Sequence, residues 1–214
     1  VRPIVPQQQQ SKIVEQFDPK KINLLFVGKF YADIRHPQYL FDLMEQLRDT
    51  PIVLHIVGPL NDRGFDKTYF EKYFTNQIPN IRFHGAVPPT EADDILLYAD
   101  ALVHLSNSVD TAMPSKILDY ISSGKPILNI CKIRTCPTLS LMERYPIGLT
   151  IFEDEGVSEL MSERVREFCS INKGKQIPYN EIKKLYPECT IEYVGNQFDE
   201  TIQEAINEFK TNKI

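Results

Sequence analysis

Short apolar runs alternate with amphipathic segments along most of this chain, and this alternation constrains its fold more than any other feature. INLLFVG at 22–28 and PIVLHIVG at 51–58 are almost entirely apolar and end in glycine. Such runs are typical of strands buried on both faces of a parallel sheet. The segment 36–49 instead places apolar side chains three and four residues apart, which is the period of an amphipathic helix.

The alternation predicts about six strands with a helix after nearly every one. Further strands are expected at 80–85, 101–107, 126–131 and 148–154, and further helices at 66–77, 90–99, 114–124, 138–144, 157–172 and 197–209. Alternating strands and helices form a parallel sheet with helices on both faces, joined by right-handed crossovers. The predicted fold class is therefore α/β, a doubly wound, Rossmann-like parallel sheet of about six strands.

The first 21 residues differ from the rest of the chain. They contain three prolines and four consecutive glutamines, and they have no usable apolar period. We interpret residues 1–21 as a linker or tail with one short ordered piece at most, and residues 22–214 as a single domain. Because the sequence opens with Val1 rather than Met, we expect it to be a piece of a longer chain.

Composition excludes several classes of protein. A net charge of −5 and the lack of a basic stripe disfavour a nucleic-acid binder. No apolar run approaches the ~20 residues of a transmembrane helix. The cysteines lack the spacing of zinc-ligand pairs, and we interpret them as free thiols of a reducing cytoplasm. We therefore expect no metal and no cofactor. The four cysteines are Cys131, Cys136, Cys169 and Cys189.

Charged and polar residues follow two of the predicted strands. GKFYADIR, after the first strand, places Lys29 and Arg35 six residues apart, and PSKILD opens the helix that follows a later strand. A helix amino terminus offers unpaired N–H groups and partial positive charge to an anion. Ser115 and Lys116 add a hydroxyl and a charge there, and Asp119 is placed to accept hydrogen bonds from sugar hydroxyls. Since strand ends meet at one edge of the sheet, these groups outline a pyrophosphate site.

Each of these features also has an ordinary structural explanation. Cations on a surface loop are usually solvated and contribute little. A Pro-Ser-Lys sequence is a common start of a helix, and an aspartate within a helix usually lies on its polar face. The spacing of the residues alone leaves both interpretations open.

From Asn23 to Ile130 the chain resembles the carboxy-terminal, donor-binding domain of retaining GT-B glycosyltransferases of the group 1, or family 4, type. The landmarks FVGKF, HIVGP, NIRFHGAVPPTEADDILLYADALVHLS and MPSKILDYISSGKPIL occur in that order. The last block is the most specific, and it is similar to the PSK-plus-EYxAxGKP form of many polysaccharide and lipopolysaccharide transferases. The resemblance covers about half of the chain securely, and residues 148–214 fit it more loosely.

The resemblance implies a role for each residue that matches a motif. Lys29 and Arg35 match two basic residues that contact the donor phosphates and stabilise the departing nucleoside diphosphate, so they are the predicted catalytic residues and no metal is required. Gly28, which precedes Lys29, is predicted to line the donor site. Asp119 matches the second glutamate of the E-x7-E motif, which binds the ribose hydroxyls. Thr111 stands at the position of the first glutamate.

The other predicted donor contacts come from two loops. The loop from Gly85 to Val87 is expected to contact the nucleobase, largely through its backbone. Thr111 cannot carry the charge of the first motif glutamate, which helps to position the donor sugar, and the adjacent Asp110 is the alternative carrier of that charge. The donor-binding residues predicted around the helix start, for phosphate and sugar, are Ala112, Met113, Pro114, Ser115 and Lys116.

The resemblance implies the donor-binding half of an enzyme that transfers a sugar from a nucleoside diphosphate to an acceptor hydroxyl with retention of configuration. Uridine diphosphate sugars are the first expectation for the donor and guanosine diphosphate sugars the second. Cell-surface polysaccharide or lipopolysaccharide synthesis is the expected process. The location is expected to be cytoplasmic, with peripheral membrane association of the full-length enzyme left open. The partner is the amino-terminal, acceptor-binding domain, which this chain lacks, so the chain alone is expected to transfer nothing.

Two alternatives belong to other functional classes. A nucleotide-sugar epimerase-like enzyme would require acidic and histidine catalytic groups in the cleft, which the sequence does not indicate. A non-catalytic α/β binding domain, such as a phosphoacceptor receiver, would require an acidic pair after the first strand, where Gly28 and Lys29 stand instead. A dinucleotide-binding dehydrogenase is disfavoured because no G-x-G-x-x-G follows any strand.

Overall fold

The structure is a six-stranded sheet in which every pair of neighbouring strands is parallel, in the order β3-β2-β1-β4-β5-β6. The computed structural model describes residues 1–4, 11–60, 64–66, 68–74 and 78–211. The strands are β1 (Ile22–Val27), β2 (Ile52–Val57), β3 (Ile81–Gly85), β4 (Ala101–Leu105), β5 (Ile127–Cys131) and β6 (Gly148–Phe152). This order confirms the predicted doubly wound, Rossmann-like fold.

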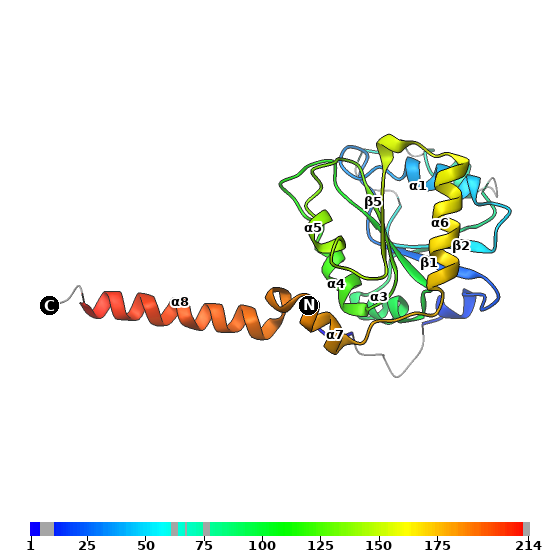
Figure 1. Cartoon of the computed structure of the whole chain (residues 1–214). Helices are drawn as coiled ribbons and strands as arrows, with labels where there is room; N and C mark the ends of the chain where they lie inside the picture. Colours follow the sequence, from blue (N-terminus) through cyan, green and yellow to red (C-terminus); the bar gives the residue numbers. More distant parts are fainter. Residues whose placement is uncertain (5–10, 61–63, 67, 75–77, 212–214) are drawn as a thin grey trace.

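Helices cover both faces of the sheet. In Figure 1, α1 and α6 lie against one face, and α3, α4 and α5 lie against the other. The helices are α1 (Gln38–Gln46), α2 (Glu71–Phe74), α3 (Pro89–Tyr98), α4 (Lys116–Ser123), α5 (Leu139–Met142), α6 (Glu159–Asn172), α7 (Tyr179–Leu185) and α8 (Ile191–Thr211), with short 3-10 turns η1 (Val14–Gln16), η2 (Glu153–Glu155) and η3 (Pro187–Cys189).

The two faces explain why the strands read as continuous apolar runs. Successive side chains of a strand point to opposite faces, and both faces are covered here. In β4, Val103 and Leu105 join the core beneath α1 and α6, whereas Leu102 joins the core beneath α3 and α4. A polar side chain in a central strand is therefore buried whichever way it points.

Most predicted elements are confirmed, with shifted ends. Helix α6 begins at Glu159 because Ser158 caps it, accepting a hydrogen bond from the Met161 amide at 3.2 Å. The helix predicted at 197–209 is part of the longer α8. Helix α7 was not predicted. The helix expected at 66–77 includes α2, but residues 67 and 75–77 lie outside the described residues.

The described part of the amino-terminal segment packs against the domain. Ile13 and Val14 are buried in the core beneath α3 and α4. Ser11 donates a hydrogen bond to the Glu91 carboxylate of α3 at 2.6 Å. Residues 5–10, with the glutamine run, lie outside the described residues.

Helix α7 packs beside α4 at the end of α4 that precedes β5. Ile182 and Tyr186 are fully buried there, and the Tyr186 hydroxyl donates to the carbonyl oxygen of Leu141 at 2.7 Å. The sequence contains the apolar spacing for this helix, since Ile182, Leu185 and Tyr186 lie three and four residues apart. Two lysines, Lys183 and Lys184, stand between these apolar residues, and the segment was interpreted as a basic surface.

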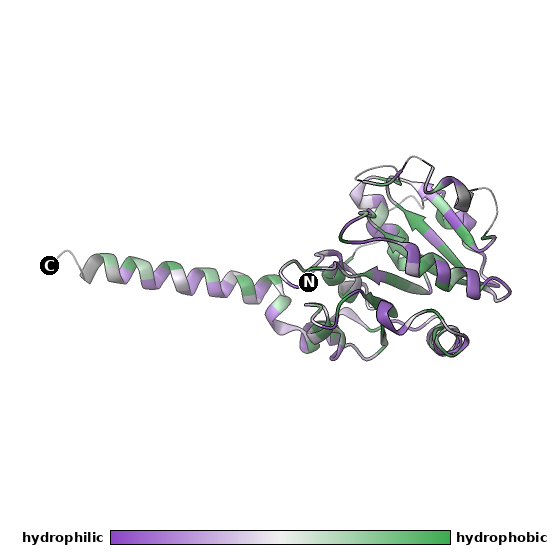
Figure 2. Ribbon diagram, turned by 90° about the horizontal axis from the view of Figure 1, so that it is seen from above, coloured by the Kyte–Doolittle hydropathy of each residue, from purple (hydrophilic) through white to green (hydrophobic). Residues whose placement is uncertain are grey.

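Helix α8 extends away from the body of the domain (Figure 1). Along it, apolar and polar residues alternate at helical spacing (Figure 2). Its exposed apolar residues include Ile191, Val194, Phe198, Ile202 and Phe209. Among the described residues, no helix is both long and apolar enough to cross a membrane.

Candidate functional site

The strand order reverses between β1 and β4, and this reversal defines the candidate site. Chain connections leave β1 and β4 in opposite directions along the sheet, because β1 continues to β2 on one side and β4 continues to β5 on the other. Ligands of doubly wound sheets bind at such a switch point, outside the carboxyl ends of the strands. Residues 28–37 follow β1 there, and residues 106–115 follow β4.

The loop after β1 closes on itself. The amide of Tyr31 donates to the carbonyl oxygen of Arg35, and the amide of Arg35 donates to that of Tyr31, both at 3.1 Å. The Arg35 guanidinium lies 5.6 Å from the centroid of the Tyr31 ring. The backbone that carries Arg35 is therefore fixed before any ligand binds.

Hydrogen bonds join this loop to the loop after β4. Arg35 donates from Nε and Nη2 to the Oδ1 atom of Asn107, at 3.1 and 2.7 Å. Asn107 in turn donates from its Nδ2 atom to the carbonyl oxygen of Ala112 at 3.1 Å. The amide of Ser108 donates to the carbonyl oxygen of Ile34 at 2.8 Å. The two loops at the switch point thus form one hydrogen-bonded unit.

Arg35 carries a positive charge that no carboxylate of the described residues neutralises. Its side chain is half-buried, and this burial lowers the pKa of the guanidinium. Within the described part of the chain it makes no ion pair, and its hydrogen-bond acceptor is the neutral amide of Asn107. A partly desolvated cation without a counter-charge favours the binding of an anion.

Helix α4 begins close to this cation. The Tyr120 hydroxyl accepts from the amide of Val27 at 2.9 Å and lies 3.3 Å from its carbonyl oxygen, which fixes α4 against the end of β1. Among the described residues, the exposed amides of Thr111, Ala112 and Met113 donate to no acceptor. These free donors, just before a helix amino terminus, suit an anion.

The other predicted site residues lie at the same edge but are less constrained. Lys29 is exposed, and Thr111 and Ser115 are exposed as well, whereas Pro114 is buried. Lys116 pairs with Asp119 on the same helix at 3.1 Å, with both side chains about one third exposed. A ribose bound to Asp119 would therefore compete with Lys116.

The predicted nucleobase loop is held by the neighbouring strand. Gly85 has a φ of 74°, and its carbonyl oxygen accepts from the amide of Gly58 at 2.8 Å. Val87 packs beside the core beneath α3 and α4. Gly58 in turn touches the first loop, because a Cβ atom there would lie 1.8 Å from the carbonyl oxygen of Gly28. Backbone contacts thus link the ends of β1, β2 and β3.

His104 lies beneath the site, in β4. Its Nδ1 atom bonds Asn129 Oδ1 at 2.8 Å, while its Nε2 atom is buried without a partner among the described residues. Burial lowers the pKa of His104 to about 4, the bond to Asn129 opposes this shift, and the charge of Arg35 adds to it. The imidazole is therefore neutral in the folded domain at pH 7.

This neutral histidine predicts a loss of stability in acid. The pKa of His104 is lower in the folded chain than the ~6.5 of an unfolded chain, so the unfolded state binds the proton first. The contribution is complete above pH 6.5 and falls by up to ~1.4 kcal/mol per pH unit as the pH drops towards 4. Urea unfolding should show that His104→Gln loses about 2 kcal/mol less than the parent chain between pH 7.5 and 5. Equal losses in both proteins would contradict a neutral, buried His104.

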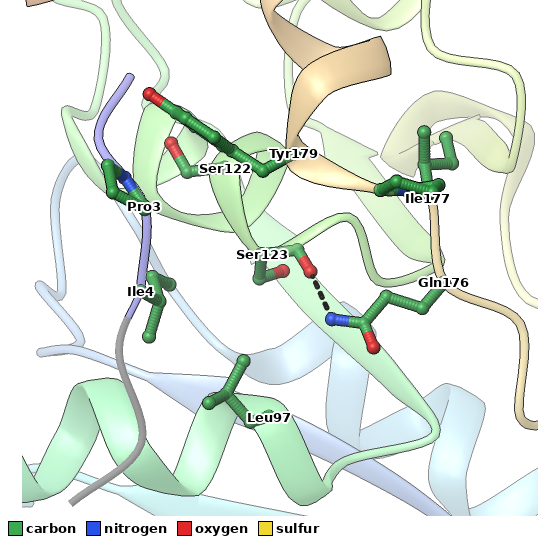
Figure 3. A pocket seen from close by; sticks show the side chains of 9 residues that line it. Pro3, Ile4, Leu97, Ser122, Ser123, Gln176, Ile177 and Tyr179 are labelled. Atoms are coloured by element: carbon green, nitrogen blue, oxygen red, sulfur yellow. Dashed lines mark hydrogen bonds between the residues drawn. The ribbon is translucent and has the colours of Figure 1, made fainter.

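A separate pocket of about 310 Å³ lies away from this edge, where the chain enters α7 (Figure 3). None of the described residues that line it is charged, and its lining includes Leu97, Ile177 and Tyr179. Gln176 donates to the carbonyl oxygen of Ser123 at 2.9 Å. A lining without a cation is unsuited to a diphosphate. No group of three or more potential metal ligands occurs among the residues that the structure describes.

The sequence profile described as glycosyl transferases group 1 matches residues 7–137, which is more than half of the chain. The chain belongs to this family. No curated protein matches it significantly by sequence. The matched range contains both loops of the switch point, with Arg35 and Asn107.

Solved glycosyltransferases share the fold of this group 1 domain. HepE (Alr3699) of Anabaena, in complex with UDP, matches with a TM-score of 0.64 at 14% identity, over 86% of this chain and 49% of its own. The lipopolysaccharide outer core galactosyltransferase WaaB matches with 0.59 at 16%, over 95% and 52%. The pneumococcal O-GlcNAc transferase GtfA matches with 0.63 at 11%, over 96% and 38%. The chain thus spans about half the length of these proteins or less, and its GT-B-type fold is confirmed.

Sequence reasoning did not identify Asn107 in this group 1 domain. It named Arg35 and Ala112, and the structure shows that Asn107 bonds to both. The available signal was the position of Asn107, directly after the apolar run of β4 at the carboxyl edge. The structure also separates Arg35, which is tied to the second loop, from Lys29, which is exposed on the first.

Proposed function

We propose that this domain binds the diphosphate of a nucleotide sugar at the β1–β4 switch point and serves as the donor half of a retaining glycosyltransferase. The observation that carries this proposal is the charge of Arg35, which is held against the loop before α4 and pairs with no carboxylate in the described part of the chain. Free amides at 111–113 and the positive end of α4 add attraction for phosphate.

This arrangement supports departure of a nucleoside diphosphate. Negative charge builds up on the leaving diphosphate when the glycosidic bond breaks, and a preorganised cation stabilises that charge without reorganisation. Arg35 and Lys29 would supply the charge, and we propose that no metal ion or other cofactor is required. Asp119 would bind the ribose, and the loop at 85–87 would contact the base.

The nucleotide is proposed by analogy. HepE of Anabaena was solved with UDP, with UDP and glucose, and with UDP-glucose, and the fold it shares with this chain supports a uridine nucleotide here. A guanosine nucleotide is the second candidate. WaaG is a glycosyltransferase of lipopolysaccharide biosynthesis, and WaaB is a lipopolysaccharide outer core galactosyltransferase. Their shared fold supports a cell-surface glycan as the product.

Calorimetric titration of the chain tests the donor proposal. UDP, GDP and ADP are compared with uridine, which lacks the phosphates. One diphosphate should bind, its nucleoside should bind far more weakly, and the affinity should fall with added salt because phosphate contacts are screened. EDTA should leave the affinity unchanged. If the folded chain binds none of the diphosphates, the donor proposal is wrong.

We also propose that the acceptor is bound by a second, amino-terminal domain that pairs with this one. Helix α8 supports this pairing, because it exposes apolar residues such as Phe198 and Ile202 that the rest of the domain does not cover. The alignment with WaaB covers 95% of this chain, so it includes part of α8. It covers only 52% of WaaB, which is therefore almost twice as long as the aligned part.

The 214-residue chain is therefore expected to transfer no sugar by itself. Transfer requires an acceptor hydroxyl held beside the donor, and proximity of the two reactants contributes much of the rate. A radiolabelled UDP-sugar assay with a simple glycoside acceptor should give product at the rate of the blank without protein. Sustained transfer by the isolated chain would show that both substrates bind here.

The two alternatives receive less support. The family match favours a transferase over an epimerase-like enzyme. A receiver-like binding domain would place acidic residues at the end of β1, and that end carries Gly28 and Lys29 instead.

A further inference from the structure

Asn107 connects the cation of the first loop to the backbone of the second. We propose that Asn107 is a positioning residue that orients the Arg35 guanidinium towards the donor diphosphate while leaving its charge uncompensated. This inference rests on the proposed donor site and adds to it a residue whose neutrality determines the strength of anion binding.

Asn107 occupies only some of the N–H donors of Arg35. A guanidinium has five N–H groups in one plane. Arg35 directs two of them, on Nε and Nη2, to the single Oδ1 atom of Asn107. Among the described residues, the other three have no acceptor. Three donors of fixed direction therefore remain for phosphate oxygens.

Asn107 is itself held in place by burial and by a second hydrogen bond. Its side chain is buried, with 7% exposed. The Nδ2 atom bonds the carbonyl oxygen of Ala112 at 3.1 Å, so both ends of the side-chain amide are engaged. The position of the guanidinium is thereby coupled to the loop at 111–113, where the free amides lie.

Asn107, the hydrogen-bond partner of Arg35, carries no charge. Arginine usually pairs with a carboxylate when it is partly buried, because an unpaired buried charge is costly. Asparagine offers the same geometry with no charge, so it holds Arg35 without cancelling its field. An aspartate here would occupy the same space and neutralise the charge that the anion needs.

Two substitutions of Asn107 separate its effect on the position of the Arg35 guanidinium from its effect on the local charge. Asn107→Ala removes the bonds to Arg35 and to Ala112 and adds no charge. Asn107→Asp also loses the bond to Ala112, but it adds a carboxylate against the guanidinium. We expect UDP affinity to fall about threefold in the alanine variant and by at least thirtyfold in the aspartate variant, in calorimetric titrations at low salt. The gap between the two variants should shrink in 0.5 M NaCl.

The control is Asn180→Asp, which adds the same charge at an exposed position of α7, beyond the opposite edge of the sheet. Its UDP affinity should equal that of the parent chain. All variants are first compared by thermal unfolding, so that only cooperatively folded proteins enter the titrations.

The outcomes distinguish this inference from the donor proposal beneath it. Weaker binding in the aspartate variant than in the alanine variant supports the role of a neutral partner. Equal affinities of the two variants, or tighter binding in the aspartate variant, would overturn it, because a purely structural brace needs only an acceptor for Arg35, which the aspartate keeps and the alanine loses. If the parent chain itself binds no diphosphate, the donor proposal fails first.

Discussion

Replacing Arg35 with alanine is expected to weaken nucleoside diphosphate binding by about ten- to a hundredfold. Arg35 is the half-buried cation of the switch point, and it has no carboxylate partner among the described residues. A hydrogen bond to a charged group contributes about 1.5–3 kcal/mol, which corresponds to this range of affinity. Calorimetric titration with UDP measures the loss directly.

Two matched variants define what Arg35 contributes. Arg35→Lys keeps the charge but loses the planar fork that bonds Asn107, so its affinity should lie between those of the parent and Arg35→Ala. Lys29→Ala removes an exposed cation of the same loop, and we expect a loss of only a few-fold, because solvent screens it. A loss of less than twofold in Arg35→Ala would place the diphosphate elsewhere, and a larger loss in Lys29→Ala would make Lys29 rather than Arg35 its main cationic contact.

Replacing Gly124 with alanine is expected to cost about 3–5 kcal/mol of folding stability, from positive-φ strain and overpacking together. Gly124 ends α4 in a left-handed conformation, with a φ of 69°. Its carbonyl oxygen accepts from the amide of Ile177 at 2.8 Å, and an added Cβ atom would lie 2.0 Å from the carbonyl oxygen of Ile177. Relieving the clash requires moving the strand-like connection to α7 or the end of α4.

Gly156→Ala is the matched control. Gly156 has a φ of 68°, and a Cβ atom there would meet no other atom within 4 Å. Its substitution should cost only the conformational strain of about 1–2 kcal/mol. The difference between the two variants in urea unfolding therefore measures the contact with Ile177. Equal losses would contradict the close packing of α4 against that connection.

The four central strands, β1, β2, β4 and β5, could be predicted from sequence because they are buried on both faces. Runs such as residues 22–28 contain almost no solvent-facing position, and they are shorter than a typical buried helix. The doubly wound class of fold followed from the alternation of strands and helices with right-handed crossovers, whereas the order of the strands came from the structure. Helices with a clear apolar stripe, such as α1 and α6, were located within a few residues.

Elements whose burial depends on distant partners could not be predicted. Ile13 and Val14 are buried because α3 and α4 offer them a surface, and their own segment shows no period. Helix α7 is short, and its three apolar residues at helical spacing are too few to predict a helix, so the burial of Ile182 becomes clear only from its contact with α4. Such positions require the tertiary fold to be known first.

The candidate site, too, could be predicted only in part from the sequence. The sequence predicted the same role, contact with the donor phosphates, for Lys29 and Arg35, because both follow β1. Their different burial depends on the loop after β4, which lies about seventy residues further along. Asn107 went unnoticed for the same reason, since its function arises from two contacts that only folding creates.

Hydrogen exchange of the chain with and without UDP, followed by mass spectrometry of its peptides, tests the location of the site most directly. A donor site at the switch point predicts slower exchange in the peptides that cover residues 28–36 and 107–118, and no change around 176–186. Slower exchange confined to the pocket beside α7, which Ser123, Gln176 and Tyr179 line, would contradict a donor site at the carboxyl ends of β1 and β4.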